Sequence, residues 1–473
     1  MEVETERRVL AKFKSDRGEE VGALYDLAIN VNTDQLTYIC NNLLEQDESA
    51  QYTFYVNEQE IVNTLEGVLD VQKLNTENVV EIIYQQQAVF KVRAVTRCTS
   101  SMPGHAEAVI SVKFSPNSKH LASGSGDTTV RFWDLTTQTP LFCCKGHNNW
   151  VLCIAWSPDS TKFVSGCKDG NIILWDPTTG KQKGPTMKGH KQWITSLVWE
   201  PYHLNAECRH FASSSKDGDI RIWDAPVGKC LRVLTSHSKS VTSLIWGGSS
   251  LLYSGSQDRT IKVWRPNDGI LCRTLEGHAH WVNSLSVNTD YVMRLGSSFR
   301  PSENVNQNNK EALKKATIER YREVCGTDGE ILVSGSDDFT MFMWKPETGK
   351  KSFARLTGHQ QLINDVKFSP DTRLLASASF DKSIKLWDGK TGKFITTLRG
   401  HVQSVYMIAW SADSRLLVSA SADSTLKVWT MKTKKLLNDL PGHVDQVFAV
   451  DWSADGEKVA SGGKDKLLKL WQY

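Results

Sequence analysis

The sequence predicts a mainly β protein in which eight similar β-rich repeats follow a small α+β module. A Gly-His step, replaced once by Ser-His, returns eight times along the 473 residues, and each copy is followed by Ser, Asp and Trp at fixed local spacing. Segments such as TVRFW and LKVW concentrate β-branched and aromatic residues as strands do, and turn groups such as KDG and SAD separate them. The beginning of the chain lacks this repeat, so we expect two modules, residues 1–91 and 92–473.

Composition is typical of a globular chain, with 40% hydrophobic and 23% charged residues. No apolar run reaches the roughly 18 residues that a membrane helix needs. The 10 cysteines form no C-x-x-C pair, which favours reduced thiols in cytosol or nucleus over a zinc or disulfide framework. Residues 1–90 hold 6 basic and 17 acidic residues, a net of −11, which leaves 50 basic and 36 acidic residues, a net of +14, for the rest. Opposite charges in the two modules indicate two kinds of partner.

The amino-terminal module is predicted to run strand, strand, helix, strand, strand. Its expected elements are strands at 8–15 and 23–30, a helix at 32–46, a strand at 52–57, a short helical or irregular stretch at 60–69 and a last strand at 78–85. The helix begins with an Asn-Thr-Asp cap signal, and five apolar residues share one of its faces. These are Leu36, Ile39, Cys40, Leu43 and Leu44.

The repeats share four residues, His, Ser, Asp and Trp. In the first two copies these are His105, Ser123, Asp127 and Trp133, and then His147, Ser165, Asp169 and Trp175. A hydrolase can use Ser, His and Asp together, but a single nucleophile does not need eight equivalent copies. We therefore interpret the four residues as structural tetrads and expect no catalytic residues.

This spacing resembles that of the WD-repeat family, and the resemblance covers residues 92–473. It implies an eight-bladed β-propeller of four-stranded blades, in which Asp orients His while Ser and Trp complete a hydrogen-bond network. A buried Asp or His is costly unless it is hydrogen-bonded, so such a network fixes the geometry of a blade. The last repeat stops after its third strand, and segment 93–101 is suited to supply the missing outer strand and close the ring.

One repeat is interrupted. His278 and His359 are 81 residues apart, whereas His359 and His401 are 42 apart, so residues of about 290–329 are predicted to be an insertion. Its stretch NNKEALKKATIERYREV has helical spacing and a basic face. A docking helix and a tolerated surface insertion both fit this pattern.

The β-β-α-β-β order of the first module resembles a ubiquitin-like domain, although no terminal Gly-Gly follows it. An acidic module of this kind, the linking segment AVFKVRAVTRCTSS and eight WD repeats with one insertion are together similar to the Notchless family of ribosome-assembly factors. The resemblance implies a monomer within a larger nuclear complex, in nucleolus and nucleoplasm, bound to the large-subunit pre-ribosome with its rRNA and ribosomal proteins and to no membrane. It further implies that the ubiquitin-like domain docks on the metal-ion-dependent adhesion site of the AAA-type ATPase midasin, whose pulling releases assembly factors.

The resemblance also points to one residue for this docking. An adhesion site holds Mg²⁺ with oxygen ligands and leaves one position open for a carboxylate of the partner. In the family this carboxylate belongs to a Glu before the last strand of the ubiquitin-like domain, and the matching segment LNTENVVEII contains Glu77. Glu77 is thus expected to complete the partner's Mg²⁺ site, with no cofactor of the chain's own.

A binding surface is expected on the propeller, because the family places the residue three after each repeat His, and the residue before each turn Asp, near one face. Trp150 and Trp193 hold the first position, and Lys168 and Lys216 the second, in repeats two and three. Exposed aromatic rings beside lysines can stack on RNA bases or anchor a protein, whereas the alternative is that the Trp rings fill space between blades.

Other functions remain open at this point. A related factor with seven repeats is disfavoured by the eight tetrads, while a substrate receptor or scaffold of a ubiquitin ligase or signalling complex, including a role in Notch signalling, is the alternative. An enzyme is disfavoured because no P-loop, H-E-x-x-H or G-x-S-x-G motif occurs.

Overall fold

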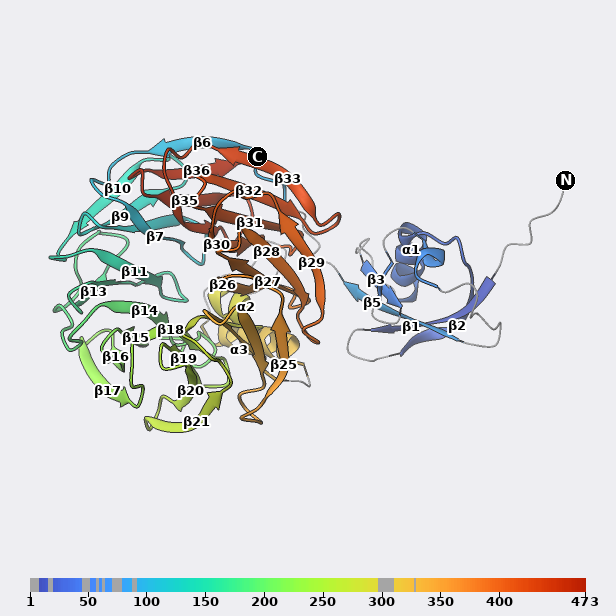
Figure 1. Cartoon of the computed structure of the whole chain (residues 1–473), viewed down its shortest axis with the longest axis horizontal. Coiled ribbons are helices and arrows are strands. Elements are labelled where there is room, and N and C mark those ends of the chain that lie inside the picture. The colour runs from blue at the N-terminus through green and yellow to red at the C-terminus, as the bar shows by residue number, and fades with distance from the viewer. Residues whose placement is uncertain are drawn as a thin grey trace. The chain divides into compact units, whose positions relative to one another are not determined.

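The computed structural model describes residues 8–15, 20–44, 52–56, 59–61, 64–69, 79–86, 92–296, 310–326 and 329–473. The chain divides into two compact units, Met1–Lys91 and Val92–Tyr473, both built mainly from strands (Figure 1). In the described residues, no helix is both long and apolar enough to cross a membrane.

The first unit is a mixed sheet with one helix packed on it. Its elements are β1 (Arg8–Ser15), β2 (Glu20–Ala28), α1 (Thr33–Leu43), β3 (Tyr52–Val56), β4 (Gln59–Glu60), a 3₁₀ turn (Leu65–Gly67) and β5 (Val80–Gln86). The strand order is β2-β1-β5-β3-β4, and the central pair β1 and β5 is parallel while the other pairs are antiparallel. The predicted cap starts α1: Asn32 Oδ1 accepts from Gln35 N at 2.8 Å, and Gln35 Oε1 accepts from Asn32 N at 3.1 Å.

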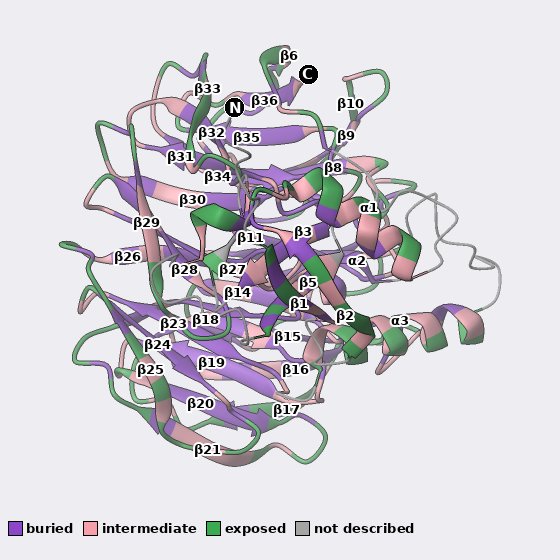
Figure 2. Cartoon of the chain, turned by 90° about the vertical axis from the view of Figure 1, so that its right-hand side faces the viewer, coloured by how far each residue is buried: buried purple, intermediate pink, exposed green. Residues whose placement is uncertain are grey.

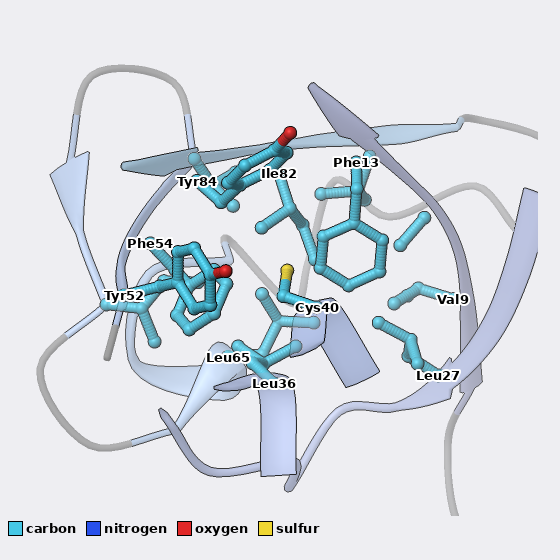
Figure 3. Close-up of a cluster of buried hydrophobic side chains, with 14 of the residues drawn as sticks. Val9, Phe13, Leu27, Leu36, Cys40, Tyr52, Phe54, Leu65, Ile82 and Tyr84 are labelled. Carbon is cyan, nitrogen blue, oxygen red and sulfur yellow. The ribbon is translucent and has the colours of Figure 1, made fainter. Parts of the chain in front are cut away.

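The core of this unit lies between α1 and the sheet (Figure 3). Leu36 and Cys40 are fully buried and face Phe13, Phe54 and Ile82 of the strands. The other three residues of the predicted helical face are partly buried against the same cluster, which confirms the face. Burial of an aromatic side chain stabilises by about 2 kcal/mol, so the buried rings contribute to holding α1 on the sheet.

The second unit is an eight-bladed propeller, and in its described residues eight sheets follow one another around a ring (Figure 1). From the innermost strand outward, blade 1 has β7 (Val109–Phe114), β8 (His120–Ser125), β9 (Thr129–Asp134) and β10 (Pro140–Lys145). Blade 2 has β11 (Val151–Trp156), β12 (Phe163–Cys167) and β13 (Ile172–Trp175). Blade 3 has β14 (Ile194–Trp199), β15 (His210–Ser215), β16 (Asp219–Asp224) and β17 (Lys229–Thr235). Blade 4 has β18 (Val241–Trp246), β19 (Leu252–Ser256), β20 (Thr260–Arg265) and β21 (Ile270–Glu276), and blade 5 has β22 (Val282–Val287), β23 (Leu332–Ser336), β24 (Thr340–Trp344) and β25 (Ser352–Thr357). Blade 6 has β26 (Ile363–Phe368), β27 (Leu374–Ser379), β28 (Ser383–Asp388) and β29 (Phe394–Arg399), and blade 7 has β30 (Val405–Trp410), β31 (Leu416–Ser421), β32 (Thr425–Thr430) and β33 (Lys435–Pro441).

The ring is closed by a strand from before the first repeat. Blade 8 consists of β34 (Val447–Trp452), β35 (Val459–Gly463), β36 (Leu468–Gln472) and, as its outer strand, β6 (Arg97–Met102). β6 runs antiparallel to β36 and pairs Met102 with Leu468 and Arg97 with Gln472. The predicted closure is confirmed, and the edge that an open ring would leave is covered.

Blades differ in their outer strands. In the described residues the outer position of blade 2 is held by two isolated bridges, Trp175 to Gln182 and Ile172 to Met187, because Pro185 between them has no N–H to donate to a ladder. Middle strands such as β19 are buried throughout, whereas outer strands such as β25 and β29 carry exposed residues (Figure 2).

The predicted insertion lies between β22 and β23 and forms α2 (Asp290–Leu295) and α3 (Lys310–Cys325). The helix expected from the basic stretch is therefore confirmed. It packs on the propeller itself: Leu313 joins a buried cluster of blade 3, and the Tyr321 ring stacks on His203 with centroids 4.7 Å apart. This loop follows the innermost strand of blade 5, so it lies at the face of the ring opposite to the repeat His.

Candidate functional site

The tetrads form closed hydrogen-bond networks inside the blades. In blade 1, His105 Nδ1 lies 2.8 Å from Asp127 Oδ2, His105 Nε2 lies 2.8 Å from Ser123 Oγ, and Trp133 Nε1 donates to Ser123 Oγ at 2.9 Å. In seven repeats the His Nδ1 to Asp Oδ2 distance lies between 2.7 and 3.1 Å. Burial alone raises the pKa of Asp127, but hydrogen bonds from His105 and Thr129 outweigh it and hold that pKa well below its usual value.

Blade 2 departs from the expected tetrad. His147 Nε2 contacts Ser165 Oγ at 2.6 Å and Trp175 Nε1 donates to the same oxygen at 2.7 Å, but Asp169 makes no hydrogen bond to His147 Nδ1. Asp169 Oδ1 instead accepts from Asn149 Nδ2 at 2.7 Å, because this amide offers a donor two residues after the repeat His. Within the described residues His147 Nδ1 has no hydrogen-bond partner. Burial lowers the pKa of His147 to about 4, so the imidazole is neutral at physiological pH.

Both predicted surface series lie on one face, because a backbone hydrogen bond joins them in every blade. Lys168 N donates to Trp150 O at 2.9 Å, and Lys216 N donates to Trp193 O at 2.9 Å. The equivalent bonds in the other blades have the donors Gly126, Gln257, Asp337, Phe380, Ala422 and Lys464. The residue before each turn Asp is therefore fixed beside the residue three after the repeat His.

The structure brings the four predicted surface residues together. Lys168 Nζ lies 4.8 Å from the ring centroid of Trp150 and 4.6 Å from that of Trp193, and Lys216 Nζ lies 4.4 Å from Trp193. Trp150 is 49% exposed and Trp193 is 41% exposed. The rings are thus half open to solvent and held by cations, each such contact contributing about 0.5–1 kcal/mol at an exposed site. We call these four residues the Trp-Lys cluster.

Three residues of the cluster, Trp150, Lys168 and Trp193, line a pocket of about 420 Å³ together with residues of innermost strands. Tyr406 and Phe448 line its other side, with ring centroids 5.7 Å apart. The sequence analysis missed these two residues. Both lie five positions after a repeat His, as do Ile110, Leu152 and Asn364 of the same pocket, so the repeat itself carried the signal. An apolar pocket with lysine at its rim can hold an aromatic or aliphatic anchor of a partner.

At the opposite face, the insertion ties distant blades together. Arg294 of α2 donates from Nη2 to Asp451 Oδ2 at 2.9 Å and to Trp452 O at 2.7 Å in blade 8. Asp451 Oδ2 also accepts from Phe114 N of blade 1 at 2.8 Å. Glu330, which ends the insertion, is 1% exposed and is surrounded by four donors. These are Gly248 N at 2.7 Å, Tyr253 OH at 2.8 Å, Ser249 Oγ at 3.0 Å and Thr289 Oγ1 at 3.0 Å.

Glu77, the predicted carboxylate for an adhesion site, lies outside the described residues. The structure describes the chain again from Val79, and β5 begins at Val80. The place of Glu77 before the last strand of the unit therefore follows from the sequence.

Comparisons with known proteins find a matching family for each of the two units. The family described as "WD domain, G-beta repeat" matches residues 96–134, 138–176, 181–224, 228–265, 350–388, 392–430 and 434–472, which leaves out the interrupted blade 5. The family described as "NLE (NUC135) domain" matches residues 9–69. A crystal structure of the computationally designed Ika8 protein covers 80% of this chain and 100% of its own at 28% identity, with a TM-score of 0.62.

Three similar proteins cover most of the chain. "Protein Notchless" of Drosophila melanogaster is 56% identical over 78% of this chain and 76% of its own length. "Notchless protein homolog" of Arabidopsis thaliana is 52% identical over 84% of each. "Ribosome assembly protein 4" of Saccharomyces cerevisiae is 46% identical over 82% of this chain and 79% of its own. Identity of this extent across both units shows that the chain belongs to the Notchless family of WD-repeat proteins.

Proposed function

We propose that this chain is a non-enzymatic assembly factor of the large ribosomal subunit, linking the pre-ribosome to a midasin-type AAA ATPase in nucleus and nucleolus. The observation that carries the proposal is the 46% identity to "Ribosome assembly protein 4" over 82% of the chain. The tetrads support a scaffold, since their Ser, His and Asp side chains hold one another inside the blades. The charge division supports two partners, because the basic propeller suits a ribonucleoprotein and the acidic unit suits a metal site.

The amino-terminal unit is proposed to be a ubiquitin-like domain that offers Glu77 to the partner's Mg²⁺. Its parallel β1–β5 pair at the centre of a five-stranded sheet, with α1 on one face, supports this assignment. A carboxylate is the hard oxygen ligand that an open Mg²⁺ position prefers. A rigid sheet carrying this ligand transmits the pull of an ATPase to the propeller through the chain between them.

Glu77→Ala is expected to abolish binding to a purified midasin adhesion domain in the presence of Mg²⁺. Glu77→Asp is expected to fail as well, because its side chain is one methylene shorter and Mg²⁺ demands ligands at about 2.0–2.1 Å. Removal of Mg²⁺ with EDTA should have the same effect on the unmodified chain. Binding is measured by pull-down and calorimetry, and co-purification of large-subunit precursor RNA is measured in parallel.

The matched control is Glu66→Ala, which removes another exposed carboxylate of the same unit. It should bind as the unmodified chain does, and all variants should still co-purify precursor RNA. Unchanged binding by both Glu77 variants would show that another residue is the ligand. Failure of the unmodified chain to co-purify large-subunit precursors would overturn the assembly function, and enrichment of cullin-type ligase subunits would favour the substrate-receptor alternative.

The Trp-Lys cluster is proposed to anchor the propeller to the pre-ribosome. Combined substitution of Trp150, Lys168 and Lys216 by alanine is expected to weaken association about 30-fold, because a central anchor contributes about 2 kcal/mol or more. The readout is the amount of precursor RNA recovered with the tagged chain. Trp281→Ala is the matched control, since Trp281 holds the same repeat position and is 40% exposed. Unchanged recovery with the triple variant would exclude the cluster.

A further inference from the structure

The turns between the third and outer strands of the blades differ in charge around the ring. In blades 1–4 the turns 134–140, 176–183, 224–229 and 265–270 hold 4 basic and 4 acidic residues. In blades 5–7 the turns 345–351, 388–393 and 430–435 hold 8 lysines and 2 acidic residues, a net of +6. Among these turns, the net positive charge is therefore confined to one arc of the propeller, and we call the turns of blades 5–7 the lysine rim.

Consecutive turns of this kind lie side by side. The outer strand of one blade contacts the turn of the next, as where Arg273 Nη1 of blade 4 donates to Pro346 O of blade 5 at 2.9 Å. The turn of blade 6 packs closely on blade 5 at Gly392. A Cβ added to this glycine would lie 2.8 Å from Met343 Sδ and 3.2 Å from the Cβ of Ala354, both in blade 5. At the same face, Asp371 N of blade 6 donates to Ser414 Oγ of blade 7 at 3.0 Å. The turns of blades 5 and 6 thus each lie against the preceding blade, and the turn of blade 7 lies at the same face of the adjacent blade.

Most lysines of this surface point their charge toward solvent. Six of its eight lysines are exposed, and five of these are Lys350, Lys351, Lys390, Lys432 and Lys435. No side chain of these five makes an ion pair with any residue that the structure describes. The Asp388 carboxylate accepts from Lys390 N at 3.0 Å and Thr391 N at 2.7 Å, so it serves to shape its own turn.

Exposed aromatic rings stand beside the lysines. Phe353 of β25 is 44% exposed and lies two residues after the turn 345–351, and Phe394 of β29 is 53% exposed and directly follows the turn 388–393. Lys345 Nζ lies 5.9 Å from the ring centroid of Phe353, and Lys385 Nζ lies 5.1 Å from that of Phe394. Flat rings interleaved with cations suit unpaired bases next to a phosphate backbone.

We propose that the lysine rim binds the phosphate backbone of structured RNA, and that it does so at the opposite face of the propeller from the Trp-Lys cluster. The inference rests on the proposed function, which supplies a ribonucleoprotein as the partner. Lysines on long stems form mobile point charges that neutralise phosphates without reading sequence. A row of turns on three adjacent blades can follow an extended chain of phosphates, whereas an acidic protein would need carboxylates placed to match each lysine.

The test reverses one exposed lysine in each turn of the full-length chain: Lys351→Glu, Lys390→Glu and Lys432→Glu. The matched control is Lys181→Glu, Lys183→Glu and Lys229→Glu, which changes the same net charge at exposed lysines in turns of blades 2 and 3. Binding to a fluorescent large-subunit rRNA hairpin is measured by anisotropy over a range of KCl concentrations. Thermal melting of each variant checks that the propeller is folded.

The rim variant is expected to bind about 100-fold more weakly near physiological salt, and its log K against log salt slope should fall by about 3, because each phosphate contact contributes about 0.9 to that slope. The RNA affinity of the control variant should fall by about threefold or less, because its substituted lysines lie away from the rim and charges beyond a Debye length are screened. Equal loss in both variants would show a bulk charge effect and overturn the proposal. Unchanged RNA binding by the rim variant would also overturn it, and loss of pre-ribosome association in that case would assign the rim to an acidic protein. Co-purification of the unmodified chain with precursor RNA tests the proposed function separately.

Discussion

Glu330→Ala is expected to lower the free energy of unfolding of the propeller by about 4 kcal/mol, since each buried donor that loses its acceptor costs about 1–3 kcal/mol. Glu330 receives hydrogen bonds from Gly248 N and from the hydroxyls of Tyr253, Ser249 and Thr289, and it is 1% exposed. Alanine would leave the N–H and the buried Tyr253 hydroxyl without their acceptor. Because burial raises the pKa of Tyr253 well above its usual value, this hydroxyl cannot escape by ionising.

The measurement is denaturant unfolding followed by tryptophan fluorescence, which reports the propeller alone because all 16 Trp lie in residues 92–473. Glu330→Gln should lower the free energy of unfolding by less, because the amide oxygen of Gln still accepts two of the four hydrogen bonds. Glu347→Ala removes an exposed carboxylate of the same blade and should stay within about 0.5 kcal/mol of the unmodified chain. If Glu330→Ala lowers the free energy of unfolding by less than about 1 kcal/mol, water replaces the carboxylate. In that case the hydrogen bonds of Glu330 do not stabilise the end of the insertion.

Much of the fold follows from the sequence because its signals are local. The tetrad residues Ser123, Asp127 and Trp133 lie within one hairpin and its neighbouring strand, so their spacing fixes a blade without knowledge of the ring. The helix α3 follows from its own periodicity, and the closing strand follows from counting strands against repeats. The Trp-Lys cluster could be predicted because each repeat places equivalent residues at one height on neighbouring blades.

What the sequence did not predict depends on contacts between distant segments or on a single donor. Asp169 turns from His147 to Asn149 because of one amide that the repeat pattern does not include. Tyr406 and Phe448 meet the Trp-Lys cluster only through closure of the ring, which brings blades 7 and 8 next to blades 1 to 3. Arg294 and Asp451 are 157 residues apart, and no local pattern links them. Buried charges of this kind are visible only once the chain is folded.

Asp451→Ala is expected to destabilise the propeller by about 3 kcal/mol, because Phe114 N loses a buried acceptor and the partly exposed Arg294 and Lys113 lose their counterion. Asp451 is 1% exposed and joins three segments at the closing seam of the ring. It accepts from Phe114 N of blade 1 at 2.8 Å and from Arg294 of the insertion at 2.9 Å, and Lys113 Nζ lies 4.0 Å from it. Burial lowers the pKa of Lys113 while Asp451 opposes this shift, so loss of the carboxylate also removes the counterion of a partly exposed ammonium.

A double-mutant cycle separates the ion pair from the backbone contact. Asp451→Asn keeps an acceptor for Phe114 N but loses the charge. The free energy of unfolding of this variant should therefore lie between those of Asp451→Ala and the unmodified chain. If the Arg294–Asp451 ion pair stabilises the fold, the two substitutions are not additive. The double variant Arg294→Met, Asp451→Ala should then lose about 1–3 kcal/mol less unfolding free energy than the sum of the two single variants. Because Asp451 links blade 8 to blade 1, amide hydrogen exchange of β6 should quicken in Asp451→Ala before that of β19 on the far side of the ring. Additive single losses, or equal exchange in β6 and β19, would mean that the insertion does not stabilise the seam and that the pairing of β6 with β36 closes the ring without it.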